Sequence, residues 1–188
     1  YIGVGSPGTC NPDTGVIEYA NNLKFDRVPL RDDLSALLDD KRVFIENDAN
    51  AAALGEALAG AAKGTQSCVC ITLGTGVGGG IIIDGKIYGG FNFAGAELGH
   101  TVIVVDGEPC TCGRLGCWEA YASATALIRQ TRRAMEAHPE SAMWKVAGTL
   151  ENVDGRTAFD ALRMGDEPAK TVVDRYIEYI ACGLINII

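Results

Sequence analysis

Five glycines fall within seven residues at one point of this chain, in the run Gly74-Thr75-Gly76-Val77-Gly78-Gly79-Gly80. Apolar segments of strand-like composition flank the run, 68–73 before it and 81–83 after it. Because glycine has no side chain, backbone N–H groups can approach an anion closely, and the Thr75 hydroxyl adds a donor. The run lacks the lysine of a P-loop, and it leads into a strand where a dinucleotide fingerprint requires a helix. It therefore predicts a hairpin that faces phosphates, with a closely packed structural hairpin as the alternative.

The remaining segments predict alternating helices and strands, an α/β signature. Before the glycine run we expect a strand and turn over 1–8, a loop-rich region over 9–29, a helix over 30–38, a buried strand over 43–45 and a helix over 49–62. After it we expect a hairpin turn at Asp84-Gly85, a strand over 101–105, a loop over 106–117, a helix over 118–138, irregular structure over 139–156, and a closing helix with an apolar stripe at Val173, Ile177, Ile180 and Leu184. We place a lobe boundary near Gly64, so that 1–64 is the remainder of an N-terminal lobe and 65–188 the first part of a C-terminal lobe with a metal-binding loop.

One histidine and three cysteines have the spacing of a metal site: His100, Cys110, Cys112 and Cys117. Glycines at 113 and 116 allow the tight loop that turns several thiolates toward one point. One imidazole and three thiolates fill the four positions of a structural zinc ion and leave none open for catalysis. The alternative is a set of unrelated core thiols with a surface histidine.

Two groups of carboxylates are candidates for substrate chemistry. Glu46-Asn47-Asp48 lies between a strand and a helix start, where Asp48 is placed to accept a hydroxyl proton during phosphoryl transfer. Plain helix capping by Asn47 or Asp48 is the alternative. Glu97, His100 and Glu119 form the second group and would line a polyol pocket, unless the glutamates are solvated surface charges.

The 188 residues include 24 acidic and 16 basic side chains, which give a net charge of −8. This charge repels nucleic acid phosphates and anionic lipid heads, so we expect neither as a direct partner of this segment. The seven cysteines form an odd set, which favours a reducing cytoplasm over a fully paired secreted framework. No apolar run approaches the ~20 residues that span a bilayer. The start without Met and the apolar last residues predict the middle of a longer protein.

Four segments in this order resemble the ROK family of repressors and sugar kinases, and within it most closely the bacterial glucokinases. They are Glu46–Glu56, Leu73–Gly80, Gly95–His100 and Cys110–Glu119. The resemblance covers almost the whole chain. It implies an actin-like ATPase (ribonuclease H-like) α/β fold with two lobes, of which this chain would be a part.

The resemblance also implies the roles of the site residues. Asp48 would take the proton of the 6-hydroxyl of glucose, which then attacks the γ-phosphate of Mg²⁺-ATP. The sugar would be bound by Gly8, Asn47, Asp48, Glu97, His100 and Glu119. The run 74–80 would face the ATP phosphates. Structural Zn²⁺ on His100 and the three cysteines would hold the loop that carries Glu119, and the family favours a homodimer.

Other functions stay open at this stage. N-acetylmannosamine or N-acetylglucosamine kinase is the nearest enzymatic alternative, and a sugar-sensing ROK transcriptional repressor or a zinc-stabilised interaction module are alternatives of another class. The family's first phosphate hairpin would lie upstream of Tyr1, and its adenosine-flanking glycine pair downstream of Ile188. We therefore expect the isolated chain to be a poor kinase.

Overall fold

The computed structural model describes residues 1–20 and 23–188, and these form two compact units. The first contains 1–72 and 78–97, and the second contains 73–77 and 98–188. Residues 65–72 and 78–97 thus pack with the first unit. The lobe boundary near Gly64 concerns the longer protein and stays a prediction. None of the helices in the described residues is both long and apolar enough to cross a membrane.

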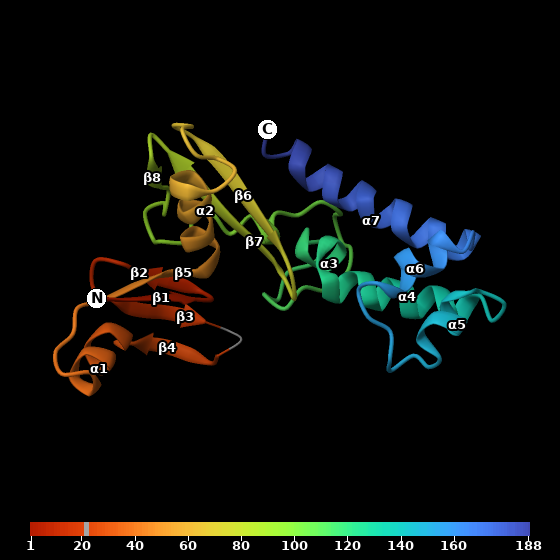
Figure 1. Cartoon of the computed structure of the whole chain (residues 1–188), viewed down its shortest axis with the longest axis horizontal. Helices are drawn as coiled ribbons and strands as arrows, with labels where there is room; N and C mark the ends of the chain where they lie inside the picture. The colour runs from red at the N-terminus through yellow and green to blue at the C-terminus, as the bar shows by residue number, and fades with distance from the viewer. Residues whose placement is uncertain (21–22) are drawn as a thin grey trace. The chain divides into compact units, whose positions relative to one another are not determined.

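The first unit contains a parallel pair of strands and a three-stranded antiparallel sheet. Strand β1 (Ile2–Ser6) pairs in parallel with β5 (Val43–Asn47), and the antiparallel sheet has the order β2 (Thr9–Asn11), β3 (Val16–Ala20), β4 (Phe25–Val28) (Figure 1). Their shared core consists of Cys10, Ile17, Ala20, Val43 and Ile45. The loop-rich prediction for 9–29 is wrong, because strands of three to five residues are too short to show a period; Asn21 and Asn22 of that region lie outside the described residues.

Two helices of this unit begin where the sequence predicts them. Helix α1 (Leu30–Leu37) packs Leu30 and Leu34 against the core, whereas Leu37 is 78% exposed. Helix α2 (Asp48–Ala59) follows β5 directly. Strand β5 buries Val43 and Ile45 but exposes Phe44, so it is covered on one face only and not buried throughout as expected.

The glycine run divides between a turn and a strand. It lies in a second three-stranded sheet, which has the order β6 (Cys68–Leu73), β7 (Val77–Ile83), β8 (Lys86–Ile87). Strands β7 and β8 are antiparallel. The predicted turn at Asp84-Gly85 is confirmed, and both residues have positive φ angles of 50° and 73°, as a two-residue hairpin turn requires. Strand β6 is only half-buried, contrary to the buried strand expected.

Glycines 78 and 80 lie inside β7, where they let helix α2 approach the strand. A Cβ at Gly80 would lie 2.4 Å from the Cβ of Ala53, and one at Gly78 would lie 3.0 Å from that of Ala49. These two glycines therefore leave room for the helix. Residues 74–77, which we call the glycine turn, precede this contact.

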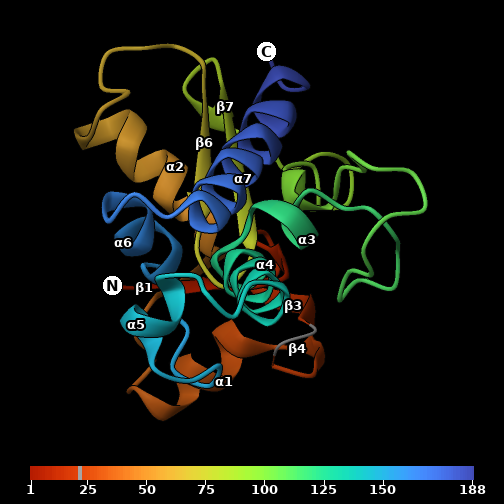
Figure 2. The ribbon, with the colours of Figure 1, turned by 90° about the vertical axis from the view of Figure 1, so that its right-hand side faces the viewer.

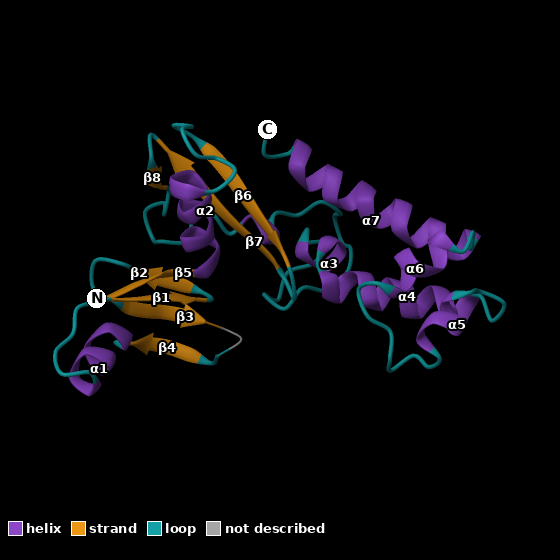
Figure 3. Ribbon diagram, in the orientation of Figure 1, coloured by secondary structure: helices purple, strands orange, loops and turns teal. Residues whose placement is uncertain are grey.

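Helices make up most of the second unit (Figure 3). They are the short 3-10 helix η1 (Leu98–His100), α3 (Glu119–Ala122), α4 (Ala124–Ala137), α5 (Met143–Ala147), α6 (Thr157–Arg163) and α7 (Glu167–Ile185). Figure 2 shows α7 beside α4 and α6, and all three contribute to one core that includes Leu127, Met135, Ala158 and Val173. The predicted helix 118–138 is confirmed with a break at Ser123, whose hydroxyl accepts from Ala126 N at 3.1 Å and caps α4.

Three sequence predictions for this unit are wrong. Residues 101–105 form no strand but a loop with one isolated bridge, Val102 to Cys117, since the backbone there bonds to the cysteine-bearing loop. Residues 139–156 contain α5. The apolar stripe of α7 is rotated: Val173 is buried, but Ile177 is 54% exposed, and Tyr176 and Gly183 are buried instead.

Trp118 explains the rotation of α7. Its ring is fully buried, its Nε1 donates to the carbonyl of Tyr179 at 2.8 Å, and a Cβ on Gly183 would lie 2.0 Å from the ring. The indole therefore packs on the side of α7 that carries Gly183, where a larger residue would clash with it. This contact fixes the residue that directly precedes Glu119.

Candidate active site and metal centre

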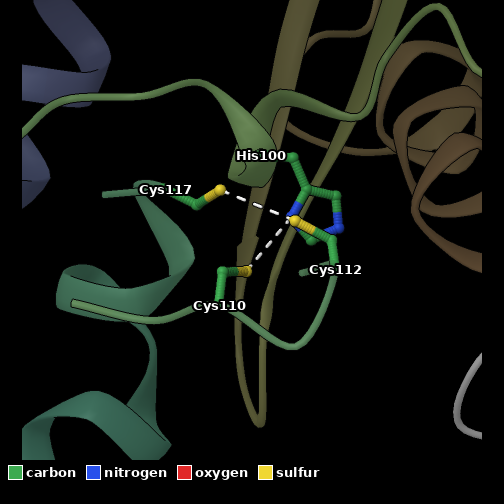
Figure 4. A group of neighbouring side chains, drawn as sticks. All are labelled: His100, Cys110, Cys112 and Cys117. Atoms are coloured by element: carbon green, nitrogen blue, oxygen red, sulfur yellow. Dashed lines mark hydrogen bonds between the residues drawn. The ribbon is translucent and has the colours of Figure 1, made fainter. Parts of the chain in front are cut away.

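The four predicted metal ligands lie together in the second unit. The ligand atoms of His100, Cys110, Cys112 and Cys117 are all within 4.8 Å of one another (Figure 4). His100 comes from η1, and the cysteines come from the loop 106–117, which we call the metal loop. The glycine at 116 has a φ of 79°, and a Cβ there would lie 1.7 Å from the carbonyl oxygen of Val104, so this turn requires glycine.

The spacing of these atoms fits a tetrahedral ion. Cys112 Sγ lies 3.7 Å from Cys117 Sγ, and Cys110 Sγ lies 3.6 Å from His100 Nδ1. Zn–S bonds of about 2.3 Å at tetrahedral angles separate two sulfurs by about 3.8 Å. The donor set is therefore both chemically and geometrically suited to zinc.

Burial disfavours the thiolate form of one predicted ligand. Burial raises the pKa of Cys117 to about 12, and its hydrogen bonds with Cys112 and Cys110 add to the rise. A metal that binds thiolates must displace those protons. Nδ1 of His100 faces the sulfurs, and Figure 4 shows the other ring nitrogen on the opposite side, away from them.

Asn47, not Asp48, caps helix α2. Its Oδ1 accepts from the N–H groups of Ala49 at 2.9 Å and Asn50 at 3.0 Å, while its Nδ2 donates to the carbonyl of Gly8 at 3.0 Å. The capping alternative therefore applies to Asn47, which is the N-cap residue.

Asp48 is exposed at the first turn of α2 and has an oxygen to spare. Its Oδ1 accepts from Ala49 N at 2.9 Å, and within residues 1–20 and 23–188 no hydrogen bond or ion pair reaches Oδ2. Asp48 therefore offers the accessible carboxylate oxygen that a general base needs.

Asp48 and Glu97 lie within electrostatic reach of one buried thiol. Burial raises the pKa of Cys10 to about 11, and the carboxylates of Glu46, Asp48 and Glu97 add to that rise. The Cys10 thiol points to the carbonyls of Ser6 and Gly8, at 3.6 and 3.8 Å. The structure thus gathers predicted site residues Gly8, Asn47, Asp48 and Glu97 in one region of the first unit.

A pocket of about 170 Å³ adjoins this region. It is lined by Cys10, Pro12, Glu46, Asn50, Ile87, Gly89, Gly90 and Phe93. Sequence reasoning did not single out Asn50, which donates to Glu46 Oε1 at 3.1 Å and is 5% exposed. Nothing in the local pattern distinguished this asparagine from the alanines around it.

In the glycine turn, the carbonyls of Gly74, Thr75 and Gly76 all accept hydrogen bonds, whereas two of the backbone amides do not donate one to any described residue. The carbonyl of Gly74 accepts from Ala124 N, and that of Thr75 accepts from Thr125 Oγ1, both at 2.8 Å. The carbonyl of Gly76 accepts from Gly74 N at 3.0 Å. In the described part of the chain, the N–H groups of Thr75 and Gly76 have no hydrogen-bond partner. Such an arrangement is suited to an anion.

Removing the Asn47 cap is expected to destabilise the first unit. Asn47→Ala loses two accepted bonds and the Gly8 contact, which should lower the free energy of unfolding by about 1–2 kcal/mol. Urea unfolding of the 188-residue chain measures this change. Asn47→Asp retains the acceptor oxygen and serves as the control. Its free energy of unfolding should fall by roughly half as much as that of Asn47→Ala. An Asn47→Ala chain as stable as the parent would show that the cap is dispensable.

Comparison with known proteins shows that the chain is similar to glucokinases and to a xylose repressor. It is 43% identical to a glucokinase of Thermotoga maritima over 191 residues, covering 100% of this chain and 60% of the relative. It is 34% identical to a xylose repressor of Caldicellulosiruptor bescii, of which it covers 46%. A crystal structure of a ROK family glucokinase from Streptomyces griseus, in complex with glucose and AMPPNP, superimposes with a TM-score of 0.88 at 37% identity, covering 98% of this chain and 60% of that one.

These similarities confirm the predicted fold and show how much of a glucokinase the chain spans. The chain has the actin-like α/β fold of ROK sugar kinases, and it spans about 60% of the length of the glucokinases it matches. The sequence profile of the family described as "ROK family" matches residues 1–188. The chain therefore belongs to the ROK family.

Proposed function

We propose that this chain is part of an ATP-dependent hexose kinase that phosphorylates the 6-hydroxyl of glucose. The main observation behind the proposal is that Asn47 and Asp48 differ in role at the start of α2. Asn47 accepts from the free N–H groups of the helix N-terminus, and the Asp48 carboxylate stays accessible. Similarity to two glucokinases over the whole chain supports the same function.

Asp48 is the proposed general base. Its Oδ2 would accept the proton of the sugar's 6-hydroxyl as that oxygen forms a bond to the γ-phosphorus, and ADP would leave with the electrons of the broken bond. The protein's part is to hold the hydroxyl in line and to receive one proton. Mg²⁺, when bound with ATP, would neutralise charge on the phosphate oxygens.

The residues proposed to bind the sugar hydroxyls are Gly8, Asn47, Asp48, Glu97, His100 and Glu119. Carboxylates accept from hydroxyls, and the Nε2 of His100 is the ring nitrogen that does not face the cysteines. Zinc on His100, Cys110, Cys112 and Cys117 would fix that ring's orientation and the metal loop. Its role is structural.

The phosphates of ATP would lie at the glycine turn. The unpartnered N–H groups of Thr75 and Gly76 support this role, and the predicted contribution of Gly78, Gly79 and Gly80 stays a prediction, since 78 and 80 pack on α2. We also propose a homodimer in the cytoplasm, without nucleic acid contact by this segment.

A hexose panel tests substrate choice. We expect the full-length protein to release ADP fastest with glucose, and slower by tenfold or more with N-acetylmannosamine and N-acetylglucosamine. Coupled detection of ADP measures the rates. Turnover of an N-acetyl sugar above that of glucose would favour the amino-sugar alternative. Sugar binding without any ADP release would favour the repressor alternative, which similarity to a xylose repressor keeps open.

A further inference from the structure

The Glu119 carboxylate contacts both the glycine turn and the metal loop. Its Oε2 accepts from the N–H of Val77 at 3.0 Å. Its Oε1 lies 3.4 Å from the hydroxyl of Thr111 and 3.8 Å from the Cys110 sulfur. Val77 and Glu119 are 42 residues apart in sequence, so this bond is a long-range tie inside the second unit.

Gly76 makes the tie possible. A Cβ at this position would lie 2.2 Å from Oε2 of Glu119, closer than any real Cβ contact, so every other residue would displace the carboxylate. At Gly74, two residues earlier, a Cβ would meet nothing within 4 Å. The two glycines of the turn therefore differ in role. Gly76 leaves room for the Glu119 carboxylate, and Gly74 has no contact with it.

The backbone of Glu119 is held from the metal side. The predicted ligand Cys117 lies two residues before Glu119. Trp118, between them, is fully buried, and its backbone N–H donates to the carbonyl of Thr101 at 2.8 Å. The position of the carboxylate thus depends on the fold of the metal loop. The Thr111 hydroxyl, which donates to Oε1 at 3.4 Å, belongs to the same metal loop.

The same turn is held on its other side by α4. Ala124 and Thr125 donate to the carbonyls of Gly74 and Thr75, whereas the side chain of Glu119 accepts from an amide of the turn, that of Val77. A hydrogen bond to a charged acceptor is stronger than one between neutral groups. The Val77 bond therefore holds the residue that directly follows the amides of Thr75 and Gly76.

We propose that Glu119 is a positioning residue that couples the metal loop to the glycine turn, so that the order of the turn depends on metal loading. The consequence for nucleotide rests on the proposed kinase function: loss of the tie weakens the site for ATP phosphates as well as that for sugar. If Glu119 only bound sugar, its substitution would change the KM for glucose and leave the KM for ATP unchanged.

Amide hydrogen exchange on the zinc-loaded 188-residue chain tests the coupling without any activity. We expect Val77 N–H to exchange at least about tenfold faster in Gly76→Ala, because the new methyl displaces the carboxylate, and also after zinc is removed by a chelator. Gly74→Ala is the matched control and should keep the parent's protection of Val77. Equal protection of Val77 in the parent, Gly76→Ala and Glu119→Ala would overturn the proposal.

Kinetics of the full-length protein test the consequence for nucleotide. Glu119→Gln keeps an oxygen that accepts from Val77 N–H, so it should retain the KM for ATP within about threefold while the KM for glucose rises. Glu119→Ala should raise both by about tenfold or more. A normal KM for ATP in Glu119→Ala would overturn this consequence. A full-length protein without kinase activity would refute the proposed function, and the exchange of Val77 would still decide the coupling.

Discussion

In the full-length protein, Asp48→Asn is expected to lower kcat for glucose phosphorylation by about 10²–10⁴-fold. The amide cannot take the hydroxyl proton, yet it has nearly the same shape and retains an oxygen for Ala49 N–H. Glucose affinity should therefore change by only a few-fold. Coupled ADP detection measures kcat, and calorimetry measures glucose binding.

Asp33→Asn is the matched control for this substitution. Asp33 lies in the first turn of α1, as Asp48 lies in that of α2, so both changes remove one carboxylate from a helix N-terminus. The control should retain kcat. If Asp48→Asn instead keeps at least a third of the parental kcat, the general-base assignment is wrong, whereas joint loss of folding and binding would make Asp48 a structural residue.

Cys112→Ala is the second change with a large expected effect. With three ligands left, the zinc affinity should fall by 100-fold or more, and the free energy of unfolding by about 4 kcal/mol. Metal analysis after dialysis should find less than a tenth of the parental zinc. Glucose affinity should fall with it, since His100 and Glu119 flank the metal loop in sequence.

Cys182→Ala provides the comparison for Cys112→Ala. Both cysteines are exposed, but Cys182 lies on α7 and is outside the ligand cluster. Its loss should leave zinc content and unfolding unchanged within about 0.5 kcal/mol. Parental zinc content in Cys112→Ala would remove this residue from the ligand set.

The four predicted metal ligands were the part of the candidate site that sequence reasoning predicted best. Thiols and an imidazole at short spacing, with glycines between them, have few other uses, and the structure brings all four ligand atoms within 4.8 Å. The helix start at Asn47 was predictable for a similar reason, because capping depends on local chemistry. Which of Asn47 and Asp48 caps was not, since that depends on the distant carbonyl of Gly8.

Long-range packing limited the rest of the prediction. The short strands β2, β3 and β4 are stabilised by a common core rather than by their own pattern, and residues 101–105 have β-branched side chains but bond to the metal loop. The glycine run looked uniform in sequence. In the structure Gly76 makes room for Glu119 and Gly80 for Ala53, two different reasons for the same residue type.

A crystal structure of the full-length protein with glucose is the most direct test of the proposed site. It should place Oδ2 of Asp48 within hydrogen-bond distance of the 6-hydroxyl, with Glu97, His100 and Glu119 on other hydroxyls of the same sugar. A glucose bound elsewhere, or an Asp48 carboxylate turned away from the 6-hydroxyl, would contradict the assignment.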